Sequence, residues 1–148
     1  IPRLSRLAIG LDAAFWTTAR NTILIMALIG TFLAVPFVLF SSQLIDLLYG
    51  HSFRNLIEIM PYLGVVLILR YTNTGASAAA IAAGLYRTRI LAPLLGLLST
   101  AALIPVIIGA GPTLSRFMII YISGIAVMLA TYAWSLYRAR AARSTKAS

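Results

Sequence analysis

The amino-acid sequence predicts an all-α integral membrane protein with four membrane-spanning helices. Of the 148 residues, 61% are hydrophobic and 10% are charged, and the mean hydropathy is +0.95. A soluble domain carries about 25% charged residues. The apolar residues fall in four runs of about twenty residues, the length that a helix needs to cross a bilayer. The sequence lacks strand-type alternation, and the runs are too long for the strands of a membrane barrel.

An amphipathic helix in the membrane interface is expected over residues 1–20, before the first span. One of its faces is apolar and holds Leu4, Leu7, Ala8, Leu11, Ala14 and Phe15. The opposite face holds Arg3, Arg6, Thr17 and Arg20. A linker between two spanning helices would show the same pattern, so both interpretations stay open.

The first two predicted spans cover residues 21–42 and 57–84. We expect Pro36 to kink the first span and Pro61 to be tolerated in the early turns of the second. Residues 44–53 form a short, more polar connection between them. It contains Asp46, Gly50 and His51.

The last two predicted spans cover residues 90–108 and 116–137. Residues 85–89 form a tight turn before the third span, and Pro93 falls in its first turn, where a missing N–H is harmless. The fourth span ends in a belt of aromatic residues at Tyr132, Trp134 and Tyr137. Residues 138–148 form a polar, basic tail.

The basic residues predict that both termini face the cytoplasm. Nine of them fall on one side of the predicted spans: Arg3, Arg6, Arg20, Arg87, Arg89, Arg138, Arg140, Arg143 and Lys146. The other side has only Arg54 and Arg116. Because Lys and Arg are enriched in cytoplasmic loops, the side with nine is the cytoplasmic one.

The second span contains a polar stripe, which is the candidate substrate-binding site. Arg70 lies near the middle of this span, where a lipid-facing arginine costs at least ~2.5 kcal/mol. Asn73, Thr74 and Ser77 follow Arg70 at spacings that put all four on one helix face. Such a stripe suits an anionic group, because Arg grips phosphate with two parallel hydrogen bonds, and the adjacent Tyr71 is expected to stack on sugar rings. The alternative is that Arg70 only bonds neighbouring helices.

Two rows of small residues also run along the second span. They are Gly75, Ala79 and Ala83, and Ala76, Ala80 and Gly84. Small residues four apart let another helix approach closely in a membrane. We therefore expect this span to have one polar face and one closely packed face.

The sequence predicts neither an enzyme nor a cofactor or metal site. Its only carboxylates are Asp12, Asp46 and Glu58, and none is paired with another on a helix face. Acid–base catalysis needs a positioned proton-transfer group and metal sites need convergent ligands. Cysteine is absent. The net charge of +9 does not indicate nucleic-acid binding, because the basic residues flank the apolar segments.

The order of features resembles the C-terminal portion of bacterial polysaccharide-biosynthesis flippases. The first span is followed by Leu48-Tyr49-Gly50 and Phe53, which match a Leu-Phe/Tyr-Gly-x-x-Phe turn of that family. The second span ends in Ala83-Gly84, with Arg87 shortly after, as in the family. Leu97-Leu98-Ser99-Thr100 replaces the asparagines usual in the penultimate helix, which leaves the subfamily open.

The resemblance implies that these are the last four of twelve or so spans in a two-lobe transporter of the bacterial cytoplasmic membrane. The cargo would be an undecaprenyl-diphosphate-linked oligosaccharide, turned between leaflets by alternating access. The partners would be this lipid-linked oligosaccharide, membrane lipid and the N-terminal helices of the same full-length protein. Peptidoglycan-precursor flippases and multidrug extruders belong to the same superfamily.

Two alternatives stay open at this point. One is a multidrug extruder of the same fold, which favours an acidic residue within the membrane over Arg70. The other is a small self-contained four-helix membrane protein that assembles with partners through the row of Gly75, Ala79 and Ala83.

Overall fold

The computed structural model describes residues 13–110 and 113–144, and these ranges are helical with short turns and contain no strand. The elements are α2 (Ala13–Leu39), α3 (Ser41–Leu48), the 3₁₀-helix η1 (His51–Ile59), α4 (Met60–Ala82), α5 (Tyr86–Ala110) and α6 (Leu114–Ser144). Four of the helices, α2, α4, α5 and α6, are long and apolar enough to cross a membrane. This confirms the predicted all-α membrane fold with four spans.

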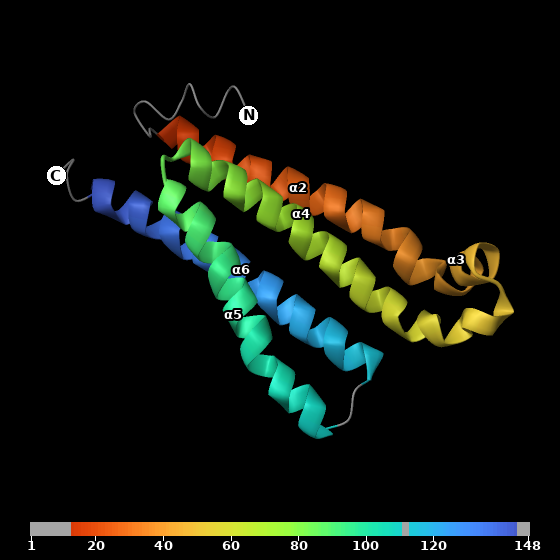
Figure 1. Ribbon diagram of the computed structural model, residues 1–148. Coiled ribbons are helices and arrows are strands. Elements are labelled where there is room, and N and C mark those ends of the chain that lie inside the picture. Colours follow the sequence, from red (N-terminus) through yellow and green to blue (C-terminus); the bar gives the residue numbers. More distant parts are fainter. Residues whose placement is uncertain (1–12, 111–112, 145–148) are drawn as a thin grey trace.

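Helix α4 lies at the centre of the arrangement (Figure 1). It packs along α2 on one side and along α6 on the other, and α5 packs mainly against α6. The start of α2, the turn between α4 and α5, and the end of α6 all lie at one end of the molecule, whereas α3 lies at the opposite end. Consecutive spans therefore run in opposite directions.

The largest buried cluster gathers the four long helices near the end where α2 begins. Its residues are Phe15, Ala19, Ala76, Ala79, Ala80, Ala92, Tyr132 and Leu136. Five of these eight residues are alanine, because membrane helices associate through close packing of small side chains and not by hiding apolar surface from water.

The predicted small-residue rows of α4 contribute to packing within this chain. A Cβ on Gly75 would lie 3.0 Å from the Cα of Ile23 on α2, and Ala76, Ala79 and Ala80 are buried. The row of Gly75, Ala79 and Ala83 therefore begins in the interface with α2, and we correct the interpretation that it forms a free surface for a partner.

Gly84 lies just beyond the end of α4, in agreement with the predicted end of the second span at residue 84, although its spacing had also placed it in the second small-residue row. Its φ is +78°, a left-handed conformation that glycine adopts without steric cost. The amide of Leu85 donates to the Ala80 carbonyl (2.9 Å) and the amide of Gly84 donates to the Ile81 carbonyl (3.0 Å). These two bonds form a Schellman motif, which satisfies carbonyls left open at a helix end.

The predicted boundary at residue 20 does not interrupt the helix. Helix α2 runs without a break from Ala13 to Leu39, and Pro36 falls near its end. No glycine or proline separates residues 13–20 from the span, so nothing stops the helix there. Residues 1–12, which make up most of the expected interfacial helix, lie outside the described residues.

Helix α5 begins at Tyr86 and not at residue 90, so Arg87 and Arg89 lie in its first turn and not in a loop. Arginine is a good helix former, and its long side chain carries the charge toward water. Pro93 consequently lies well inside the helix, where its missing N–H removes a helical hydrogen bond, contrary to the expectation of a harmless position. Pro61 does lie at the start of α4, as predicted.

Two further segments, the predicted polar connection and the predicted basic tail, are largely helical where the structure describes them. Helix α6 continues to Ser144, so residues 138–144 of the expected tail are helical, and residues 145–148 lie outside the described part. Basic residues favour the end of a helix, where they complement its dipole. Residues 44–48 fall in α3 and residues 51–53 in η1, with Tyr49 and Gly50 between the two helices, and Ile45 of α3 is fully buried. Burial of one apolar side chain gives this short amphipathic helix a place to pack.

Candidate functional site

Arg70 lies near the midpoint of α4 and faces the side where α4 meets α6. Its side chain is exposed, and its Nη1 donates a hydrogen bond to the hydroxyl of Tyr121 on α6, at 3.2 Å. Arginine has five N–H donors, and this contact engages one of them. One N–H of the guanidinium is therefore engaged, and the others can donate to a further acceptor.

The other members of the predicted stripe follow Arg70 along the same face of α4. Thr74 is exposed and its hydroxyl donates to the Arg70 carbonyl at 3.0 Å. Ser77 is half-buried one turn further on. The Thr74 oxygen keeps lone pairs that can accept a hydrogen bond, but its proton is committed to the helix backbone.

The side-chain oxygen of Asn73 lacks a hydrogen-bond partner among the described residues. Its Oδ1 is buried and has no hydrogen-bond partner within residues 13–110 and 113–144, although the residue as a whole is half-buried. Buried polar atoms are almost always hydrogen-bonded.

Tyr71 lies on a different face of α4 from the stripe. A Cβ on Gly30 of α2 would meet the Tyr71 Cβ at 2.9 Å, so the Tyr71 side chain leaves α4 on the α2 side. Four of the five predicted residues thus share a face, and Tyr71 does not join them. Its stacking on a sugar stays a prediction.

Tyr121 is the functional candidate that sequence reasoning missed. It lies in the fourth predicted span, where a tyrosine by itself is a common apolar residue. Its role depends on the packing of α4 against α6, which brings it to Arg70 across 51 positions of sequence. The only signal in the sequence is a hydroxyl inside a span, and that signal does not identify its partner.

The site is cationic in the part of the chain that the structure describes. Arg70 has no ion-pair partner there, and both described carboxylates, Asp46 and Glu58, lie in α3 and η1, away from the middle of α4. No group of three or more His, Asp or Glu residues that would hold a metal ion occurs among the described residues. Chemically, the arrangement can hold an anion or polarise an oxygen.

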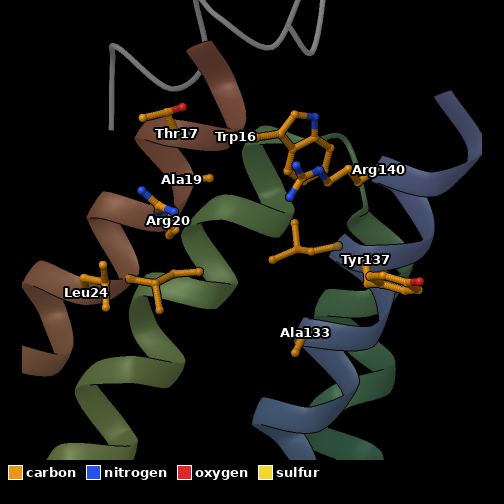
Figure 2. Close-up of a pocket in the computed structure, with 10 residues that line it drawn as sticks. Trp16, Thr17, Ala19, Arg20, Leu24, Ala133, Tyr137 and Arg140 are labelled. Carbon is orange, nitrogen blue, oxygen red and sulfur yellow. The ribbon is translucent and has the colours of Figure 1, made fainter. Parts of the chain in front are cut away.

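A pocket of about 530 Å³ lies elsewhere, between the first turns of α2 and the last turns of α6 (Figure 2). It is lined by Trp16, Thr17, Ala19, Arg20, Ile23, Leu24, Ala133, Leu136, Tyr137 and Arg140. None of the residues predicted for substrate binding contributes to it.

Comparison of the chain with models of known families, with curated proteins and with solved structures found no match.

Proposed function

We propose that this chain is the C-terminal part of a membrane flippase that moves an undecaprenyl-diphosphate-linked oligosaccharide across the bacterial cytoplasmic membrane. The observation that carries the proposal is Arg70, a cation in the middle of a membrane span with a neutral hydroxyl as its hydrogen-bond partner. An arginine without a carboxylate partner at this depth favours an anionic cargo, because burying its charge alone is costly. The order of the Tyr49-Gly50 turn and the Ala83-Gly84 helix end supports the same class.

In this proposal Arg70 binds the diphosphate or an acidic sugar of the cargo. Tyr121 accepts a hydrogen bond from Nη1, and the other N–H groups of the guanidinium are left for the cargo. A charge-assisted hydrogen bond contributes about 1.5–3 kcal/mol. Binding of this kind must reverse in each transport cycle, which a single cation permits more easily than a cluster.

The same proposal includes the orientation of the chain. The end that contains the start of α2, the α4–α5 turn and the end of α6 carries Arg20, Arg87, Arg89, Arg138 and Arg140. By the positive-inside rule this end faces the cytoplasm, with both termini on that side. The exposed face of α4 would then be completed by helices from the N-terminal part of a longer protein.

The test is Arg70→Ala in the full-length protein, expressed in cells that lack the native gene. We expect surface polysaccharide to fall by roughly tenfold or more, the effect of losing one charge-assisted bond. Arg70→Lys keeps the charge but not the paired geometry and should restore export in part, and Tyr121→Phe should lower it less than Arg70→Ala. Protein amount in the membrane is measured alongside.

Normal export with Arg70→Ala at normal protein amount would refute the proposed role of Arg70. Normal surface polysaccharide in cells that lack the gene altogether would refute the flippase function.

A further inference from the structure

The pocket between α2 and α6 combines an apolar floor with charged and aromatic rims. Ala19 of α2 and Leu136 of α6 are buried beneath it, and Ile23 is half-buried. Trp16 lines the pocket at the upper end in Figure 2, and Tyr137 lines it further down, at about the level of Leu24. Trp and Tyr are the side chains that gather at membrane surfaces. The pocket is therefore amphipathic along its length.

Two arginines stand on opposite sides of the pocket, at about the same level (Figure 2). Arg20 comes from α2, and Arg140 extends from α6 toward α2. Both are exposed, and neither has an ion-pair partner among residues 13–110 and 113–144. Asp12, the carboxylate closest to Arg20 in sequence, lies outside the described residues. The two guanidinium groups leave donors available for an anion.

The pocket opens onto the part of α2 that would face lipid. Leu24 lines the pocket and is 53% exposed, and Leu28, one turn further along the same face, is 69% exposed. Ala133 on α6 is small and leaves room on the other side. An apolar track therefore leads from the two arginines toward the middle of the span, the path that an acyl chain takes.

We infer that this pocket is a binding site for an acidic phospholipid. The phosphate of the headgroup lies between Arg20 and Arg140, and one acyl chain runs along Leu24 and Ala133. A membrane lipid fits better than a soluble phosphate, because the charged part of the pocket is continuous with an exposed apolar track. The site shares no residue with the Arg70 stripe, so it stands whether or not the chain is part of a flippase.

The test is lipid binding by the purified full-length protein, measured by native mass spectrometry with phosphatidylglycerol and with phosphatidylcholine. We expect phosphatidylglycerol to bind roughly tenfold more tightly, and Arg20→Gln with Arg140→Gln to abolish that preference. The matched control is Arg87→Gln with Arg138→Gln, which removes two charges from the same end. In this control pair Arg138 lies 5.2 Å from the Trp134 ring centroid and neither residue lines the pocket, so the preference should persist.

Equal loss of preference in both double variants would overturn the inference, because a general positive field would then explain lipid selection. Full competition by inorganic phosphate would also overturn it, in favour of a soluble anion. If the Arg20→Gln/Arg140→Gln protein fails to fold, Ala133→Phe replaces it, since a phenyl ring fills the acyl track without changing charge. Unchanged preference in a folded Ala133→Phe protein would likewise refute the site.

Discussion

The α2–α4 pair meets at three glycines spread along its length, whereas the α5–α6 pair meets where one glycine faces another. A Cβ on Gly30, Gly64 or Gly75 would come within 2.9–3.0 Å of the partner helix in the first pair. In the second pair, a Cβ on Gly96 would lie 2.8 Å from the carbonyl oxygen of Gly124, and a Cβ on Gly124 would collide with the Thr100 hydroxyl.

The difference predicts two kinds of helix contact. Three close approaches hold α2 and α4 side by side, in antiparallel directions, over several turns, so the loss of one leaves two. The glycine contacts of α5 with α6 are confined to one place, around Gly96 and Gly124, and other faces of α5 expose large side chains such as Leu97 and Leu98. Because membrane helices depend on close packing for association, the α5–α6 pair should be the more fragile.

The largest effect is expected from Gly96→Ala. Its new Cβ would lie 2.5 Å from Met128 Cγ and 2.8 Å from the carbonyl oxygen of Gly124, so α5 must move away from α6 at this contact. We expect a loss of about 3 kcal/mol in the free energy of unfolding, measured by circular dichroism during unfolding in mixed micelles. Leu97→Ala, at an exposed neighbouring position, is the control. A loss no greater than the control's would mean that the crossing is not tightly packed.

A smaller effect is expected from Gly30→Ala. The added methyl would approach the Tyr71 Cβ at 2.9 Å and the Ile68 Cα at 3.0 Å, but the contacts at Gly64 and Gly75 remain. We expect a loss of about 2 kcal/mol in the same experiment, with Leu28→Ala as the exposed control. If Gly30→Ala costs more than Gly96→Ala, the contrast between the two helix pairs is wrong.

The smallest effect is expected from Gly84→Ala, which tests backbone conformation without packing. No atom lies within 4 Å of the position that its Cβ would take, so only the left-handed φ of +78° opposes the substitution. The cost should be about 1 kcal/mol. Gly50→Ala is the matched comparison, because Gly50 has φ +77° and equally open surroundings. Clearly different costs for the two would show that one turn makes contacts beyond its backbone.

Hydropathy and spacing were sufficient to predict the four spans and the close packing around Gly75, because these depend on local composition. Hydropathy and spacing did not predict local structure where a residue type is compatible with two structural positions. Gly84 continues a small-residue row by spacing, yet it ends the helix, and spacing carries no information on the sign of φ. The charges of Arg87 and Arg89 suggested a loop, although arginine is compatible with the first turn of a helix.

Within the candidate site, the stripe of Arg70, Asn73, Thr74 and Ser77 followed from helical periodicity alone. The bond from Arg70 to Tyr121 did not, because it requires knowing which helix packs against which face of α4. The pocket between α2 and α6 was missed for the same reason, since Arg20 and Arg140 come from opposite ends of the chain.

The short turn at Gly84 has a consequence for how the chain enters the bilayer during synthesis. The span of residues 56–82, which contains α4, has the lowest mean hydropathy of the four spans and carries Arg70, whose transfer from the translocon into lipid costs about 2.5–3.5 kcal/mol. Only residues 83–85 separate it from α5. We therefore expect α4 to leave the translocon together with α5 as one hairpin, with α2 already in the membrane to receive it.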